Sequence, residues 1–374
     1  MAHPDGSRPG ESGPRITVIM PVLNGMELLP RSIGALEASD LDPQAWSLLV
    51  VDDGSTDGTA DWVRARGHQV VATEGGPLGP GAARNVGARH ASGDVLAFVD
   101  ADVCAHPDAL RRFAELFDTQ PDVGAAFGAY DTRPTAPGFI SQYRNLYHRY
   151  VHLRGAGDAE TFWAGCGAVR RDVFAEVGGF DIERFPRPQI EDIELGYRIR
   201  DAGWRIVLDP RIQGTHMKRW TLSGMLRTDL FDRGVPWMRL LLAEPRPNSL
   251  NVGIADRLRV AGVGLACLLI VAALVLWNGV AALTALAVLG AVTVSNPPLF
   301  RWYARERGFL FALGVVPFHI LFHFVSGCSV ALAILGHVAS GVTPARAGRT
   351  FENSVEPAPD RPDDGLFLSS REPR

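Results

Sequence analysis

Short, uniformly hydrophobic runs alternate with helical patterns in the first part of the chain. Three runs, 16–20, 48–51 and 95–99, predict strands, and each is followed directly by Pro or Asp. Because these runs do not alternate with polar residues, they are typical of parallel strands covered on both faces. The segments 57–66 and 80–91 between them predict helices. We therefore expect an α/β fold with a doubly wound, mostly parallel sheet.

Residues 131–215 show a less regular pattern that ends in another helix and strand. A helix is expected over 191–202, with Gly203 as its C-terminal cap, and a strand over 204–208. We expect this α/β unit to complete one domain, residues 15–220.

The C-terminal part has a different pattern. There is no Asp, Glu, Lys or Arg from 260 to 300, nor from 308 to 345. Since a membrane-spanning helix needs about 20 apolar residues, about three spans are expected within 260–340. We place them at 260–277, at 280–298 and within 309–338. Pro317 leaves open whether the last stretch crosses once or forms a re-entrant pair.

Residues 221–259 mix large apolar side chains with arginines. This composition suits amphipathic helices at a membrane interface, and equally a surface helix that covers the domain core. Arginines also cluster before the first predicted span and after the second. By the positive-inside rule we expect a multi-pass protein of the cell (inner or plasma) membrane, with its N-terminal domain in the cytoplasm.

Composition narrows the class of protein. Hydrophobic residues make up 47% of the 374 and charged residues 21%, which excludes a disordered chain. The net charge of −4 argues against nucleic acid as a partner, because nucleic-acid-binding proteins usually carry a basic excess. The polar ends, 1–14 and 341–374, are expected to be disordered.

Acidic residues follow two of the predicted strands, where ligands bind in doubly wound sheets. Asp100 and Asp102 are two apart on an extended segment, so their side chains face the same way. Two such carboxylates suit Mg²⁺ or Mn²⁺, which keeps positions open for phosphate oxygens. The alternative is a solvated acidic turn, and the position after a buried strand favours the metal site.

Two further segments suit a nucleotide. Asp52 and Asp53 end the strand 48–51 and can accept hydrogen bonds from a base or ribose, although a turn with a helix cap also explains them. The glycine-rich stretch 75–85 opens a helix but lacks the third glycine of a dinucleotide fingerprint. It suits a phosphate, with Arg84 adding positive charge.

The later part of the domain supplies a possible base and further charges. Glu191 and Asp192 begin the predicted helix, whose dipole is expected to keep a carboxylate ionised. Such an Asp can take a proton from an attacking hydroxyl, while ordinary helix-terminal charge complementarity is the alternative. His216 could be a third metal ligand, and Lys218 and Arg219 could neutralise phosphate.

In their residues and in their order along the chain, these motifs resemble those of the family-two glycosyltransferases of the GT-A fold. The matching segments are 21–24, 51–58, 81–85, 100–102, 178–181 and 191–192. The resemblance covers about residues 15–220. It implies an inverting transferase that uses a nucleotide-diphospho-sugar donor with Mg²⁺ or Mn²⁺.

The resemblance also implies roles. Asp192 is the general base, Asp102 and Asp100 hold the metal diphosphate, and His216 stands where some members have a metal-binding histidine. The segment 216–220 ends in the Arg-Trp of a Gln-x-x-Arg-Trp signature but lacks its Gln, which argues against processive polymer synthesis. The substrate-binding candidates are Asp52, Asp53, Arg84, Asp100, Glu191, Lys218, Arg219 and Trp220.

Three functions follow as hypotheses. The first is a membrane-anchored glycosyltransferase that modifies a hydroxyl or carboxyl of a lipid-linked or hydrophobic acceptor. In the second, a polyprenyl-phosphate sugar synthase, a phosphate oxygen attacks and needs no base, so Glu191 and Asp192 favour the first. The third, a non-catalytic nucleotide-sugar-binding membrane subunit, predicts loss of the acidic residues, all of which are present.

Overall fold

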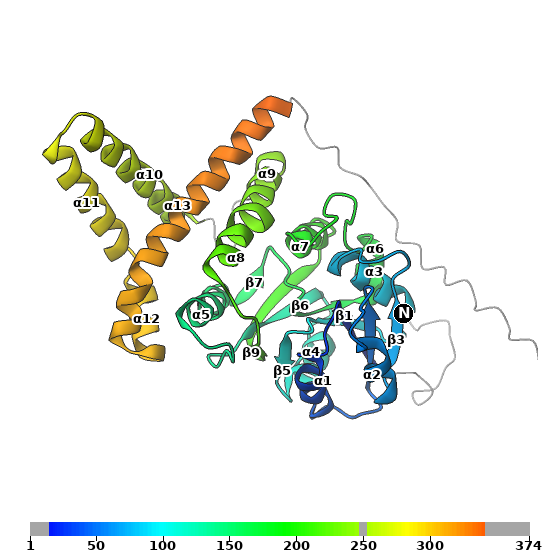
Figure 1. The fold of residues 1–374 in the computed structure, drawn as a ribbon. Coiled ribbons are helices and arrows are strands. Elements are labelled where there is room, and N and C mark those ends of the chain that lie inside the picture. Colours follow the sequence, from blue (N-terminus) through cyan, green and yellow to red (C-terminus); the bar gives the residue numbers. More distant parts are fainter. Residues whose placement is uncertain (1–14, 247–252, 341–374) are drawn as a thin grey trace, which may run out of the picture.

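The computed structural model describes residues 15–246 and 253–340. They form an α/β domain followed by helices that extend away from it (Figure 1). The expected disordered ends, 1–14 and 341–374, lie outside the described residues, as does 247–252 within the segment 221–259.

The strands of the described residues form one sheet. They are β1 (Ile16–Val22), β2 (Trp46–Asp52), β3 (Gln69–Ala72), β4 (Val95–Val99), β5 (Val103–Ala105), β6 (Val123–Tyr130), β7 (Gly157–Ala159), β8 (Cys166–Arg170) and β9 (Arg205–His216). Their order is β3-β2-β1-β4-β8-β6-β9-β5, with β7 beside β9. The strands from β3 to β4 are parallel, whereas β8 is antiparallel to both β4 and β6. The sheet is thus mixed, with the expected parallel arrangement in its N-terminal half.

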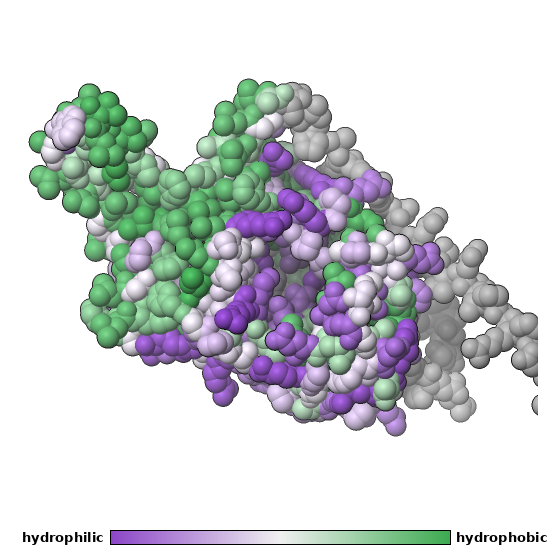
Figure 2. Space-filling view, in the orientation of Figure 1, coloured by the Kyte–Doolittle hydropathy of each residue, from purple (hydrophilic) through white to green (hydrophobic). Residues whose placement is uncertain are grey.

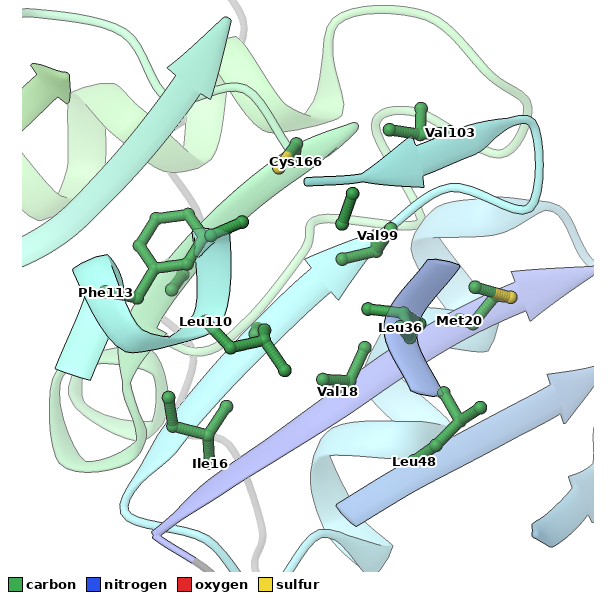
Figure 3. Close-up of a cluster of buried hydrophobic side chains, with 14 of the residues drawn as sticks. Ile16, Val18, Met20, Leu36, Leu48, Val99, Val103, Leu110, Phe113 and Cys166 are labelled. Atoms are coloured by element: carbon green, nitrogen blue, oxygen red, sulfur yellow. The ribbon is translucent and has the colours of Figure 1, made fainter. Parts of the chain in front are cut away.

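Helices cover both faces of this sheet (Figure 1). They are α1 (Leu29–Glu37), α2 (Thr59–Ala65), α3 (Pro80–His90), α4 (Ala109–Thr119), α5 (Phe139–Arg154), α6 (Arg171–Glu176) and α7 (Glu191–Asp201). On one face, Val18 of β1 and Val99 of β4 pack with Phe113 of α4 (Figure 3). On the other, Ile19 and Phe98 pack with α3, α6 and α7. Both faces of the strands are therefore buried, which explains their uniformly apolar sequence.

The C-terminal helices begin along the domain and then leave it. They are α8 (Leu222–Arg227), the π-helical η1 (Thr228–Gly234), α9 (Val235–Ala243), α10 (Ile254–Val275), α11 (Gly279–Val294), α12 (Pro297–Arg307) and α13 (Phe309–Ser340). Hydrophobic side chains gather over α10 to α13, and hydrophilic ones over the domain (Figure 2).

By length and composition, α10 and α13 can each cross a membrane, and α11 with α12, bent by 65°, adds a third span if the pair counts as one. The sequence predicts about three spans, which is the number obtained when the bent pair counts as one span. The helix α13 continues through Pro317, so the re-entrant pair that the sequence left open is not formed. His319 and His323 on this helix are buried, as intramembrane polar side chains are expected to be.

Helix α5 joins the domain to the C-terminal helices. Its Phe139 contacts Phe311 and Phe318 of α13, and Tyr303 of α12 donates a hydrogen bond of 2.9 Å to the carbonyl of Tyr143. The segment after β9 is also packed on the domain, because Leu240 of α9 lies in a buried cluster with residues of α7. This packing agrees with the surface-helix interpretation of 221–259, and the membrane interface stays a prediction.

Candidate active site

The acidic candidates meet at the edge of the sheet where the parallel strands end, and Arg84 lies among them. Arg84 of α3 is 5% exposed, and its Nη2 donates to Asp100 Oδ1 over 2.6 Å. Its Nη1 approaches Glu191 Oε1 of α7 at 3.4 Å. A buried guanidinium must be paired, so Arg84 connects the end of β4 to the start of α7. The structure thus bonds Arg84 to carboxylates, and its role toward phosphate stays a prediction.

The motifs 81–85 and 178–181 are brought together by Asn85. Its side-chain amide donates to the carbonyl of Phe180 over 2.8 Å and accepts from the amide of the same residue over 2.9 Å. The Arg84 guanidinium lies 5.5 Å from the centre of the Phe180 ring. These contacts fix the position of Arg84, because Arg84 and its neighbour Asn85 are both held against Phe180.

Asp53 is buried and almost fully hydrogen-bonded. Its Oδ1 accepts from Thr73 Oγ1 at 2.7 Å and from the amide of Leu78 at 2.9 Å, and its Oδ2 accepts from the amide of Gly79 at 2.8 Å. A side chain at Gly76 would meet Thr73 Oγ1 and Asp53 Oδ1, so only glycine fits there. Asp53 therefore holds the loop after β3 against β2. Asp52 accepts from the amide of Ser55, and nucleoside binding by either carboxylate stays a prediction.

Asp102 lies against His216, at 3.3 Å between Oδ2 and Nε2. On its other side, His216 Nδ1 lies 2.7 Å from Oδ1 of Asn145, a residue of α5 that is 1% exposed. The same Oδ1 accepts from the indole of Trp220 at 3.0 Å, and Asn145 Nδ2 donates to the carbonyl of Lys218 at 3.0 Å. Asn145 thus contacts the last residue of β9 and two residues that follow this strand.

This arrangement fixes the tautomer of His216. An indole N–H only donates, so the atom that it shares with His216 is the acceptor oxygen of Asn145. Nδ1 of His216 must therefore carry a proton, and Nε2 faces the Asp102 carboxylate. Nε2 and Asp102 Oδ2, 3.3 Å apart, need a proton or a cation between them. A second proton makes the contact an ion pair, and once that proton is released the two side chains suit a hard divalent cation.

Asp100 does not join that pair, because it is bonded to Arg84. Among the described residues, no group of three or more His, Cys, Asp or Glu side chains is arranged to hold a metal ion. The three-residue set expected from the sequence is thus present as a facing pair, Asp102 and His216, with Asp100 turned to another partner. Burial raises the pKa of the Asp102 carboxyl, but His216 and Lys218 outweigh it and lower the pKa below its usual value.

The basic residues after His216 differ in position. Lys218 lies near Asp102 and has its Nζ 4.5 Å from the centre of the Trp220 ring. Trp220 is buried and packs against α5 and α12, which is a structural role. Arg219 is exposed. The structure therefore brings Lys218 to the site, whereas substrate contacts by Arg219 and Trp220 stay predictions.

Asp192 stands in the first turn of α7, where its Oδ2 accepts from the amide of Ala164 at 3.3 Å. Burial and the neighbouring Glu191 raise the pKa of Asp192 to about 6, against the opposing charges of Arg233 and Arg84. Desolvation thus opposes the helix dipole, which the sequence predicts will keep this carboxylate ionised. A carboxylate with this pKa is mostly ionised at neutral pH and suits a general base.

A cavity of about 580 Å³ opens beside Asp192 and runs between the domain and the C-terminal helices. Its wall is mainly apolar by area, and most of its polar and charged side chains come from α5, α7, η1, α10 and α13. Side chains of the domain and of the C-terminal helices line it, among them Trp163, Asp192, Arg233, Trp237, Phe322 and Val330. Asp53, Asp100, Asp102 and His216 do not line it. The cavity thus connects the candidate base, and not the facing pair of Asp102 and His216, to α10 and α13.

Sequence reasoning missed two residues of this region. Nothing in the local pattern marks Asn145, because its partners lie more than 70 residues further along the chain. Arg233 belongs to the arginine-bearing apolar segment 221–259, and that unusual mixture was the available signal. Only the packing of η1 beside α5 and α7 gives it a position near Asp192.

Comparison with known proteins agrees with this geometry. Residues 17–178 match the family described as Glycosyl transferase family 2. Over 223 residues the chain is 31% identical to validoxylamine A glucosyltransferase of Streptomyces hygroscopicus subsp. limoneus, which is 51% of this chain and 49% of that protein. Over 115 residues it is 31% identical to undecaprenyl-phosphate 4-deoxy-4-formamido-L-arabinose transferase of Salmonella paratyphi A. This match covers 29% of this chain and 35% of that protein. The chain thus spans half or less of the length of these relatives.

The fold is shared with a solved structure, mannosyltransferase PcManGT from Pyrobaculum calidifontis in complex with GDP-Man and Mn²⁺. The TM-score is 0.56 at 22% identity, over 82% of this chain and 88% of the other.

Proposed function

Since residues 17–178 form a glycosyl transferase family 2 domain, we propose that this protein is an inverting, membrane-anchored glycosyltransferase. It moves a sugar from a nucleotide-diphospho-sugar to a hydroxyl of a lipid-linked acceptor. The observation that carries the proposal is the cavity that joins Asp192 to the apolar helices α10 and α13. We further propose that the domain lies on the cytoplasmic side, as the arginine clusters predict.

The donor is proposed to bind at the sheet edge, with Asp102 and His216 holding Mg²⁺ or Mn²⁺. Support comes from the 3.3 Å approach of His216 Nε2 to Asp102 Oδ2, and from the Mn²⁺ and GDP-Man bound by the solved protein of the same fold. When bound, the cation offsets the negative charge of the diphosphate. Lys218, the nearest cation of the segment after β9, adds positive charge on the same side.

Asp192 removes the proton of the acceptor hydroxyl as its oxygen forms a bond to the anomeric carbon. The bond from that carbon to the diphosphate oxygen breaks, and the diphosphate leaves with the electron pair. Because attack comes from the side opposite the leaving group, the anomeric configuration inverts. Trp163 and Phe322 line the cavity and offer apolar surface to the acceptor.

The relative that transfers to undecaprenyl phosphate favours a second candidate, a polyprenyl-phosphate sugar synthase. In that reaction a phosphate oxygen attacks, and Asp192 has no proton to remove. The raised pKa of Asp192 favours the hydroxyl acceptor, because a carboxylate with this pKa suits a general base that works near neutral pH.

The full chain in nanodiscs, with Mn²⁺, a panel of UDP- and GDP-sugars and lipid extract, tests the proposal. We expect one donor to be consumed with formation of a glycolipid, and Asp192→Asn to reduce turnover by about 10² to 10⁴ while donor affinity is kept. Asp61→Asn, at an exposed carboxylate of α2, is the matched control. Full activity of Asp192→Asn would exclude the hydroxyl acceptor with this base. Donor binding without turnover by the wild type would point to the non-catalytic subunit.

A further inference from the structure

We propose that Arg233 binds an anionic group, phosphate or carboxylate, carried by the lipid acceptor next to the hydroxyl that is glycosylated. The inference rests on the proposed function, because it assigns a chemical class to the occupant of the acceptor cavity. It concerns the end of the cavity near Asp192, where side chains from α5, α7 and η1 meet.

The charges around the cavity leave Arg233 without an anionic partner. Arg144 forms a buried ion pair with Asp229, and Asp256 is paired with Arg259 over 2.7 Å. Within the part of the chain that the structure describes, no carboxylate oxygen lies within 4.0 Å of the Arg233 guanidinium. Two of the three wall carboxylates are thus paired with other arginines. The third, Asp192, feels the charge of Arg233 but forms no ion pair with it, so the Arg233 guanidinium is available to a ligand.

Among the described residues, the one hydrogen-bond contact of the Arg233 side chain is with a neutral ring. Its Nη1 lies 3.5 Å from His148 Nε2 on α5. Burial, together with Arg144 and Arg233 itself, lowers the pKa of His148 well below its usual value, so the ring carries no charge. A guanidinium offers five donors, so Arg233 has several N–H groups free to bind an anion.

The backbone of Arg233 is held firmly. Arg233 lies in the π-helical turn η1, a type of turn that is frequent at functional sites. The next residue, Gly234, packs so closely on α13 that an added Cβ would lie 2.2 Å from Ser329 Oγ. This contact fixes the base of the Arg233 side chain between α13 and α5, so its charge is presented at a defined position.

The position of Arg233 points to the acceptor and not to the donor. Arg233 lines the cavity with Asp192, whereas the residues proposed for nucleoside and metal, Asp53, Asp102 and His216, do not. The rest of the wall reaches the apolar helices α10 and α13. An acceptor with an anionic group at Arg233 and a hydrocarbon chain along α13 matches both the charge and the apolar surface.

Calorimetry on the detergent-solubilised full chain tests the proposal, with farnesyl phosphate, farnesol and inorganic phosphate as probes. A charge-assisted bidentate contact predicts that farnesyl phosphate binds roughly tenfold or more tightly than farnesol. Arg233→Met should lose most of this preference, and Arg233→Lys should retain part of it. Arg239→Met is the matched control, since Arg239 is an exposed arginine of α9 that does not line the cavity.

Three results would overturn the proposal. Equal affinities of the wild type for farnesyl phosphate and farnesol would remove the anion site. Inorganic phosphate that binds as tightly as farnesyl phosphate would indicate a free-anion site. Loss of UDP or GDP binding with Mn²⁺ in Arg233→Met would assign the residue to the donor. A wild type that prefers farnesyl phosphate but transfers no sugar would instead refute the proposed function and leave this site standing.

Discussion

Replacement of Asn145 by leucine tests the tautomer argument, on which the proposed metal site depends. Asn145 is buried and makes hydrogen bonds of 2.7, 3.0 and 3.0 Å to His216, Trp220 and Lys218. Leucine has nearly the same volume but neither accepts nor donates. Each buried group left without a partner costs about 1–3 kcal/mol, so Asn145→Leu should lower the free energy of unfolding by several kcal/mol.

We expect Asn145→Leu to reduce the affinity for Mn²⁺ as well. Without Asn145 Oδ1, His216 can carry its proton on Nε2, the nitrogen that faces Asp102. Loss of a partner that orients a metal-binding histidine typically reduces metal affinity by about 10- to 100-fold. Asn145→Asp keeps the acceptor oxygen and so should retain most of the Mn²⁺ affinity, which protects the test if the leucine variant is poorly folded.

Two measurements decide the matter. Long-range ¹H–¹⁵N correlation on protein labelled in histidine, without metal, identifies the protonated nitrogen of His216, and Mn²⁺ titration followed by electron paramagnetic resonance gives the affinity. Gln142→Leu is the matched control, since Gln142 is a hydrogen-bonded amide of the same helix with no contact to His216. A proton on Nε2 but not on Nδ1 in the wild type, or unchanged Mn²⁺ affinity in a folded Asn145→Leu, would refute the reasoning.

Three further predictions concern acidity and packing. Because the pKa of Asp192 is raised to about 6 and the base acts when ionised, kcat/KM should fall as the pH drops through about 6; Glu191→Gln, which removes a like charge, should move this fall to lower pH, and a move to higher pH would contradict the assignment. Arg84→Met leaves Asp100 and Glu191 unpaired and should destabilise the domain by about 3–5 kcal/mol in chemical denaturation; an unchanged midpoint would show that the ion pairs contribute little. Gly234→Ala should lower the Tm, at a cost of about 1–3 kcal/mol, because an added Cβ would meet both Ser329 and the carbonyl of Asp229; Ser329→Gly in the same chain should restore the part due to Ser329, and an unchanged Tm of Gly234→Ala would contradict the close packing.

The sequence predicted the elements whose signal is local. The strand expected at 95–99 is β4, and the helices expected at 80–91 and 191–202 agree with α3 and α7 to within one residue at each end. These elements are marked by apolar runs, by turn residues and by helix caps, all of which act between near neighbours. The position of Asp100 and Asp192 at the ends of such elements was therefore readable, together with the family resemblance.

Tertiary structure alone decided which of these residues meet. Arg84 and Glu191 are 107 positions apart, and His216 and Asn145 are 71 apart, so no local pattern relates them. The raised pKa of Asp192 was also not readable from the sequence, because the helix dipole is a local property whereas desolvation depends on everything packed around the carboxylate. Local periodicity fixes elements, while the partners and solvent exposure of a charge depend on contacts between distant elements. The contact between Asp102 and His216, the cavity beside Asp192 and the position of Arg233 in its wall all depend on such contacts between distant elements.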